Sequence, residues 1–265
     1  MEILLEGDCR DHLKQLIEKG IQVDLTVTSP PYDNLRTYNN TCEWNLNICK
    51  EIINLLFKIT KDGGIVVWVV GDKTQKGSET GTSFKQALAF IETGFNLNDT
   101  MIWNKPNKMP EVKQPRYNQS FEYMFVFSKG KPKTFNPIMV PCKCAGQKYD
   151  STCKNIGGEN GRKHKTFNIN NEKVKSNIWD IAVAKNKTSH PAIFPEQIAH
   201  DHITSWSNEG DIILDPFMGS GTTGIVAKKL NRNFIGIEKV HEYYELSKNR
   251  IKNNEKNDIE RNEKE

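Results

Sequence analysis

Short apolar runs alternate with helical repeats along most of the chain. Runs of about four to seven mainly apolar residues, bounded by polar residues or glycine, are typical of buried strands. The predicted strands are residues 2–5, 23–27, 65–71, 97–103, 121–127, 211–214 and 234–237. Apolar residues spaced three and four apart predict helices at about 9–19, 44–60, 84–93 and 195–206, and in a stretch ending at 230. This alternation predicts an α/β fold with a mostly parallel sheet and helices on both faces.

One long segment, residues 131–187, loses this periodicity and is rich in Gly, Asn and Lys. It holds 12 of the 37 Lys and Arg residues but only 4 of the 33 Asp and Glu residues. Such a local excess of positive charge favours a polyphosphate partner, although a lysine-rich solvated surface has the same composition. We expect an insertion that contacts nucleic acid.

Composition predicts a polar protein without a membrane span. Mean hydropathy is −0.64, and no apolar run approaches the ~20 residues that cross a bilayer. The first six residues are too short and acidic for a signal peptide, so a cytoplasmic protein with reduced cysteines is expected. Cys142, Cys144, Cys153 and His164 are candidates for a zinc site, but their spacing is not that of a usual zinc motif, so no metal is predicted.

The segment Thr28-Ser29-Pro30-Pro31-Tyr32 directly follows the predicted strand 23–27. Proline cannot donate to a sheet ladder and pushes the preceding residue into an extended conformation. The strand should therefore stop here, with carbonyl groups directed outward beside a hydroxyl and an aromatic ring. Such a rigid cluster of acceptors suits a flat group that carries an NH2.

A glycine-rich loop follows the strand 211–214. It reads Asp215-Pro-Phe-Met-Gly-Ser-Gly-Thr-Thr-Gly224, and the next strand ends in Glu238. Glycines allow the backbone to approach a ligand closely, and a carboxylate at this distance suits ribose hydroxyls. Alone, this pattern fits NAD, FAD or S-adenosylmethionine equally well.

Together the two motifs resemble the amino-methylating DNA methyltransferases of restriction–modification systems. In that family Ser/Asp/Asn-Pro-Pro-aromatic is the catalytic motif, and Asp-Pro-Phe-x-Gly-x-Gly-Thr-Thr binds S-adenosylmethionine. The catalytic motif comes first here, as in the family's β-class order. The resemblance spans about residues 5–250. It implies a circularly permuted Rossmann-like fold, with residues 1–130 and 188–265 forming the catalytic and cofactor-binding domain and 131–187 an inserted target-recognition region.

The resemblance also implies roles for individual residues. The catalytic group is Ser29, Pro30, Pro31 and Tyr32, with Tyr32 stacking on a flipped-out base. The cofactor group is Asp8, Phe194, Asp215, Phe217, Gly219, Gly221, Thr222 and Glu238. Asp8 could instead be only the amino-terminal cap of the first helix. Candidate DNA contacts are Lys105, Lys113, Arg116, Arg162 and Lys163.

The implied activity is methylation of double-stranded DNA, with S-adenosylmethionine as cofactor. Serine at the first motif position favours N4 of cytosine over N6 of adenine. A cognate endonuclease is a possible partner, and the protein is expected to be a monomer or homodimer. Three alternatives remain: an NAD-dependent oxidoreductase, a DNA-binding protein that retains the fold without catalysis, and methylation of RNA or of a protein glutamine.

The permuted order carries a geometric requirement. The last two predicted strands are too few to form a nucleotide-binding half, so they must pair with the amino-terminal strands in one sheet. We therefore expect Asp8, Ser29, Phe217 and Glu238 to meet at one sheet edge, near the point where the strand order reverses.

Overall fold

The computed structural model describes residues 1–31, 44–108, 116–153, 163–183 and 195–262. The chain divides into two compact units. The larger consists of Met1–Asn136 and Asn177–Glu265, and the smaller of Pro137–Ser176. The smaller unit is thus inserted into the sequence of the larger one.

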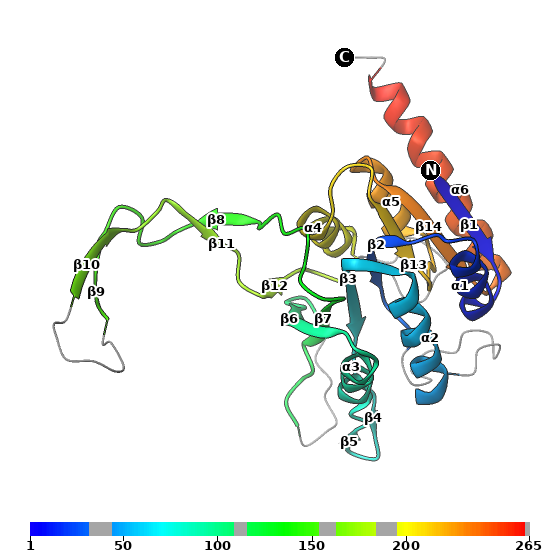
Figure 1. Cartoon of the computed structure of the whole chain (residues 1–265), viewed down its shortest axis with the longest axis horizontal. Helices are drawn as coiled ribbons and strands as arrows, with labels where there is room; N and C mark the ends of the chain where they lie inside the picture. The colour runs from blue at the N-terminus through cyan, green and yellow to red at the C-terminus, as the bar shows by residue number, and fades with distance from the viewer. Residues whose placement is uncertain (32–43, 109–115, 154–162, 184–194, 263–265) are drawn as a thin grey trace. The chain divides into compact units, whose positions relative to one another are not determined.

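A central sheet of eight described strands organises the larger unit (Figure 1). Their order is β1 (Glu2–Glu6), β14 (Asn233–Glu238), β13 (Ile212–Asp215), β2 (Val23–Thr28), β3 (Thr60–Val70), β7 (Phe121–Ser128), β6 (Asn96–Asn104) and β12 (Ile178–Asp180). Neighbours pair in parallel except at β7, which is antiparallel to β3 and β6. The predicted mostly parallel α/β fold is confirmed. Amino-terminal β1 pairs with carboxy-terminal β14, as the permuted motif order requires.

Helices cover both faces of this sheet. On one face, α1 (Cys9–Glu18), α2 (Leu46–Ile59) and α3 (Thr82–Thr93) pack side by side; α4 (Glu196–Trp206), α5 (Thr222–Lys229) and α6 (His241–Asn262) form the other layer (Figure 1). The direction of the crossovers explains this division. Crossovers between parallel strands are right-handed. The step from β2 to β3 through α2 and the step from β13 to β14 through α5 run in opposite directions across the sheet. The two helices must therefore lie on opposite faces.

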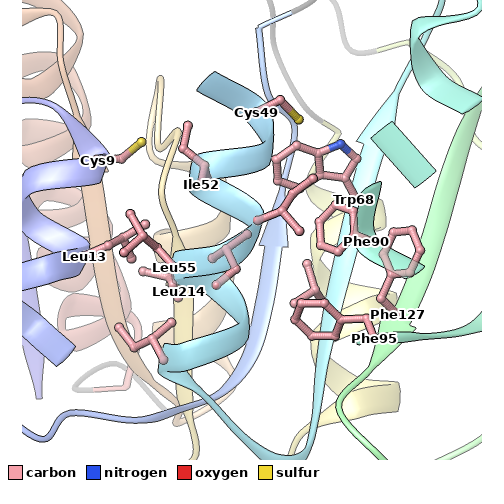
Figure 2. Close-up of a cluster of buried hydrophobic side chains, with 14 of the residues drawn as sticks. Cys9, Leu13, Cys49, Ile52, Leu55, Trp68, Phe90, Phe95, Phe127 and Leu214 are labelled. Atoms are coloured by element: carbon pink, nitrogen blue, oxygen red, sulfur yellow. The ribbon is translucent and has the colours of Figure 1, made fainter. Parts of the chain in front are cut away.

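An aromatic cluster fills the core between α2, α3 and the sheet. Figure 2 shows Trp68, Phe90, Phe95 and Phe127 gathered beside α2. The rings of Phe90 and Phe127 stack with centroids 4.1 Å apart, and Trp68 meets Phe90 edge to face at 5.1 Å. Trp68 Nε1 donates to Oε1 of buried Gln86 at 2.7 Å. The cluster therefore fixes β3 against α3, and the neighbour of β3, strand β2, leads into the Ser-Pro-Pro-Tyr segment.

Several element boundaries differ from those predicted. Helix α2 begins at Leu46 because Asn45 caps it, and α3 begins at Thr82, two residues earlier than expected. Strand β3 begins at Thr60 rather than at residue 65, with a register shift against β2. The hairpin of β4 (Thr74–Gln75) and β5 (Ser78–Glu79) was not predicted, because two-residue strands have no measurable periodicity.

The smaller unit contains two short hairpins. Strand β8 (Met139–Pro141) pairs with β11 (Glu172–Val174), and β9 (Lys148–Cys153) pairs with β10 (Lys163–Asn168). This unit spans fewer residues than the predicted segment 131–187. At its carboxyl side, β12 pairs with β6 of the central sheet, and at its amino side Asn136 donates its backbone N–H to the Ser205 carbonyl of the larger unit. Within the described part of the chain, no helix has the length and apolar character needed to cross a membrane.

Two phenylalanines on α3 provide a test of the core. Phe90→Ala should lower the free energy of unfolding by about 3–5 kcal/mol, because a fully buried ring leaves a cavity. Phe84 is 50% exposed on the same helix, so Phe84→Ala should cost less than about 1 kcal/mol. Urea denaturation of both variants measures the difference, and equal decreases would contradict the packing described here.

Candidate active site

Four parallel strands end at the same edge of the sheet, and each is followed by a predicted site residue. Asp8 follows β1, Glu238 ends β14, Phe217 follows β13, and Ser29 follows β2. The predicted convergence is confirmed. The strand order reverses between β13 and β2, and such a switch point is where ligands bind in open α/β sheets.

A buried hydrogen bond joins the two strands at the switch point. Thr28 Oγ1 donates to Asp215 Oδ1 at 2.6 Å, and the Phe217 backbone N–H donates to the same oxygen at 3.1 Å. At the opposite end of this strand pair, the Asp24 carboxylate accepts from the Ile212 backbone N–H at 2.9 Å. The catalytic strand and the cofactor-loop strand are therefore held in register at both ends. Sequence reasoning assigned no role to Thr28; the available signal was a polar residue closing a buried apolar strand.

Asp215 and Glu238 are two buried carboxylates in this edge. Asp215 is 4% exposed and Glu238 9%. Burial raises the pKa of Asp215 to about 6, opposed by hydrogen bonds from Thr28, Thr223 and the Phe217 backbone. Burial also raises the pKa of Glu238, opposed by the Val240 and Gly219 backbone N–H groups, which donate to its two oxygens at 2.9 and 2.8 Å.

The two buried carboxylates, Asp215 and Glu238, suit a ligand that carries positive charge. Neither Asp215 nor Glu238 forms an ion pair with a described residue, although burying an uncompensated charge is costly. A ligand carrying positive charge would relieve that cost. Gly219 (φ 53°) and Gly221 (φ 79°) lie in the left-handed region, where side chains are disfavoured. A Cβ at Gly221 would come within 2.9 Å of Ser247 on α6, so this glycine lets the loop pack closely against that helix.

Aromatic side chains form one wall beside the loop. The half-buried Phe217 ring meets Trp44 edge to face at 5.6 Å and Trp68 at 6.0 Å. Thr222, the first residue of α5, is buried, and its hydroxyl lies 3.5 Å from that of Ser220. The buried Thr222 side chain thus contacts the glycine loop at Ser220. Phe194, predicted for the same pocket, lies outside the described residues.

Asp8 is the amino-terminal cap of α1. Its Oδ1 accepts from the Arg10 backbone N–H at 3.0 Å, and its carboxylate pairs with the Arg10 guanidinium at 2.9 Å and the Lys239 ammonium at 3.1 Å. The hydrogen bonds from Arg10, outweighing desolvation, hold the pKa of Asp8 well below its ordinary value. Of the two roles left open by the sequence, the structure shows the cap.

The Ser-Pro-Pro-Tyr motif is described as far as its second proline. Strand β2 ends at Thr28, as the two prolines predict. Ser29 is half-buried, Pro30 is buried and Pro31 is half-buried. Tyr32 lies outside the described residues.

The two described DNA-contact candidates already have carboxylate partners. The Lys105 ammonium pairs with Glu122 and lies 4.3 Å from the Trp103 ring centroid. The Arg116 guanidinium pairs with Glu79 and donates to Thr74 Oγ1 at 2.6 Å. Lys113, Arg162 and the side chain of Lys163 lie outside the described part. A phosphate role for Lys105 or Arg116 would require these pairs to open.

The cysteine cluster is only partly visible. Cys142 is half-buried and Cys144 exposed in the smaller unit, and neither is in a disulfide. The side chains of Cys153 and His164 lie outside the described residues, so the zinc alternative is not tested.

Comparisons with known proteins agree with this geometry. A DNA methylase family model for N6 and N4 methyltransferases matches residues 23–249. The orphan methyltransferase M.BamHII of Bacillus amyloliquefaciens is 51% identical over 243 residues, covering 87% of this chain and 89% of the relative. The Type II methyltransferase M.SmaI of Serratia marcescens is 30% identical over 285 residues, covering 94% and 90%.

A solved structure extends the likeness to three dimensions. The M1.HpyAVI–SAM complex superposes with a TM-score of 0.61 at 26% identity, over 94% of this chain and all of that one. The cytosine-N4-specific PvuII DNA methyltransferase shares the fold with a TM-score of 0.68 at 20% identity, over 93% and 84%.

A permuted sheet, a proline-stopped catalytic strand and a carboxylate-lined glycine loop thus define an amino-methyltransferase of DNA. The chain belongs to the N6/N4 DNA methylase family of the restriction–modification type. Its cofactor is S-adenosylmethionine, a cation that suits the two buried carboxylates. The oxidoreductase alternative is excluded by this membership.

The buried Asp215 carboxyl predicts a pH dependence of stability in the cofactor-free protein. A carboxyl with a raised pKa binds more protons folded than unfolded, so its protonated form stabilises folding, and this contribution is lost as the pH rises through about 6. Asp215→Asn removes the titration. Relative to the wild type, the variant should gain up to roughly 3 kcal/mol between pH 4 and pH 8, at about 1.4 kcal/mol per pKa unit. Urea unfolding at both pH values measures the gap, and a pH-independent gap would contradict the assignment.

Proposed function

We propose that this chain methylates N4 of cytosine at a specific site in double-stranded DNA, with the target base flipped out of the helix. The observation that carries the proposal is the catalytic loop at the switch point. Ser29 and Pro30 directly follow Thr28, whose hydroxyl is bonded to Asp215 at the start of the cofactor loop. The Thr28–Asp215 hydrogen bond thus connects the segment with the amine acceptors to the cofactor loop. Serine before Pro-Pro supports cytosine as the target, through the resemblance stated above.

The catalytic residues act on the exocyclic amine. An amine attached to an aromatic ring is a poor nucleophile because its lone pair is delocalised. In this proposal the Ser29 hydroxyl oxygen and the Pro30 carbonyl accept the two N–H groups, draw the nitrogen toward tetrahedral geometry and stabilise the positive charge that develops on it. Pro31 keeps the loop extended, and Tyr32 stacks on the extruded base.

The cofactor residues position the methyl donor, S-adenosylmethionine, which supplies an electrophilic methyl group on sulfur. Glu238 has lone pairs beyond those used by Gly219 and Val240, and we propose that they accept from the ribose hydroxyls. Asp215 places negative charge near the methionine amine, and Gly219 and Gly221 admit the methionine backbone.

The remaining cofactor candidates have supporting roles in this proposal. Phe217 and Phe194 line the pocket with apolar surface, and Thr222 holds the glycine loop. Asp8 acts through Arg10 and Lys239, which it orders beside the ends of β1 and β14.

Target recognition is assigned in this proposal to the inserted segment 131–187, of which Pro137–Ser176 form the compact part. That unit has eight Lys and Arg residues and three Asp and Glu residues, a balance that suits a phosphate backbone. Arg162 and Lys163 are proposed DNA contacts within it. The proposed setting is the cytoplasm, where host DNA is protected from a cognate endonuclease. The relative M.BamHII is named an orphan methyltransferase.

The product identifies the target base. DNA incubated with the protein and S-adenosylmethionine is digested to nucleosides and separated by mass spectrometry. N4-methylcytosine is the expected product. N6-methyladenine would refute the cytosine assignment while leaving the amino-methyltransferase class intact, and absence of any methylated nucleoside would favour a fold retained without catalysis.

Ser29→Ala tests the catalytic role. The kcat of the variant should fall about 100- to 1,000-fold, by analogy with the removal of one oxyanion-hole donor, because the acceptor acts mainly in the transition state. Calorimetry should show unchanged affinity for S-adenosylmethionine. The reciprocal variant, Glu238→Gln, should lower that affinity at least tenfold, since it removes charge-assisted hydrogen bonds. A Ser29→Ala protein unable to bind the cofactor would contradict this division of roles.

The smaller unit provides a separate test of DNA binding. Replacing Lys173 and Lys143 by Gln should weaken DNA binding and reduce the slope of log affinity against log salt by about one unit for each phosphate that is no longer neutralised. Cofactor affinity should stay constant, because Glu238 and the glycine loop lie outside the segment. A matched pair on the larger unit, Lys19 and Lys85 replaced by Gln, serves as the control. Equal slopes for all proteins would contradict recognition by this unit.

A further inference from the structure

A groove of about 630 Å³ opens on the larger unit, apart from the glycine loop. It is lined by Glu79, Arg116, Tyr117, Asn118, Gln119 and Phe121. The groove is largely open to solvent and has room for a nucleobase with its sugar. Tyr117 is 98% exposed, which is unusual for a large ring without a partner to cover it. None of the roles proposed above uses Tyr117, Asn118, Gln119 or Phe121.

The groove stands at the same sheet edge as the catalytic loop. The registers Thr28↔Trp68 and Trp68↔Phe125 place β2, β3 and β7 side by side. Because β7 is antiparallel to β3, its first residue, Phe121, lies at the edge where β2 ends. Phe121 lies two strands away from Ser29, at about 4.8 Å per strand, and three residues further along the strand direction, at about 3.4 Å per residue. Combining these two perpendicular displacements gives a distance of about 14 Å between the two residues. This distance is too long for the reacting base and suits a nucleotide one or two steps away.

The groove is held in place from several sides. The Arg116 side chain pairs with Glu79 of β5 and donates to Thr74 of β4, so the β4–β5 hairpin forms one wall. The other end of the segment is closed by the Lys105 backbone N–H, which donates to the Ser120 carbonyl at 2.7 Å. Residues 116–121 therefore present their side chains from a braced backbone, and a pre-ordered surface loses little entropy when it binds.

The lining has the chemistry of base recognition and lacks that of phosphate binding. Glu79 neutralises Arg116, so the lining carries no net charge and gives little attraction for a phosphate. The side-chain amides of Asn118 and Gln119 each offer donors and an acceptor, the combination that pairs with base edges. The exposed Tyr117 ring offers a stacking surface of the kind that binds unpaired bases.

From these observations we propose that the groove is a specificity-determining subsite, which binds a base of the DNA flanking the flipped target. Tyr117 stacks on this base, and Asn118 and Gln119 contact its polar edge. The inference rests on the proposed DNA methylation and adds to recognition by the smaller unit, because it places part of the reading on the catalytic unit itself.

The test compares groove variants with a matched control, using full-length protein and genomic DNA from a host without methylation. Tyr117→Ala should lower kcat/KM for DNA roughly ten- to a hundredfold, the decrease that corresponds to one base–aromatic stack, whereas Tyr117→Phe should keep the wild-type value. KM for S-adenosylmethionine should not change in either variant. Gln119→Ala should relax the methylated sequence at one position, mapped by sequencing the modified DNA; Gln15→Ala, an exposed glutamine on α1, should leave it unchanged.

Other outcomes separate the two proposals. If the wild type methylates DNA while Tyr117→Ala and Gln119→Ala match it in rate and in methylated sequence, the subsite is refuted and the proposed function stands. If Tyr117→Ala loses affinity for the cofactor as well, the groove belongs to the cofactor site and the subsite is also refuted. If the wild type methylates no DNA, the proposed function itself fails.

Discussion

The hydrogen bond from Thr28 to Asp215 is the interaction on which the site depends. It crosses the switch point of the sheet, where β2 and β13 are neighbours although 187 positions separate the two residues along the chain. One strand leads to the proposed amine acceptors and the other to the cofactor loop. The bond is 2.6 Å long and excluded from solvent, so a shift of either strand would cost a buried carboxylate one of its few hydrogen-bond donors. In the proposed mechanism, the register of the two strands at this point therefore sets the distance between the amine acceptors and the cofactor loop.

Electrostatics in the same edge follow from burial. Asp215 and Glu238 are held by hydrogen-bond donors that carry no formal charge, and their pKa values are raised. In the proposed site, Asp215 would balance the positive charge of S-adenosylmethionine, and Glu238 would accept hydrogen bonds from its ribose. Asp8 is the contrasting case, because Arg10 and Lys239 already satisfy its carboxylate. Three acidic residues at one edge therefore divide into two suited to a cation and one that stabilises the fold.

The proposed division of roles between the two units has a physical basis. Catalysis of methyl transfer requires that the reacting groups be held within fractions of an ångström. The packed sheet and its aromatic cluster provide this rigidity. Long-range attraction to phosphates requires only a concentration of positive charge, which the short hairpins of the smaller unit supply with little core of their own. The groove at Tyr117 belongs to the first kind, since its backbone is braced by the sheet and its lining has no net charge.

The sequence by itself determined both motifs, seven of the eight described strands of the central sheet and five of the helices that cover it, because these follow from local periodicity and from the conformational limits of proline and glycine. It also required the two ends of the chain to share one sheet, since neither set of strands could form a nucleotide-binding fold alone. Only the tertiary structure decided the role of Asp8, the partners of Lys105 and Arg116, and the importance of Thr28. Each of these depends on which side chains meet across long separations in the chain, and local pattern carries no information about such meetings. The hairpins of 137–176 escaped prediction for a related reason. The strands of one hairpin have only three residues, and the six-residue strands of the other are mostly polar, so neither has an apolar alternation that would reveal it.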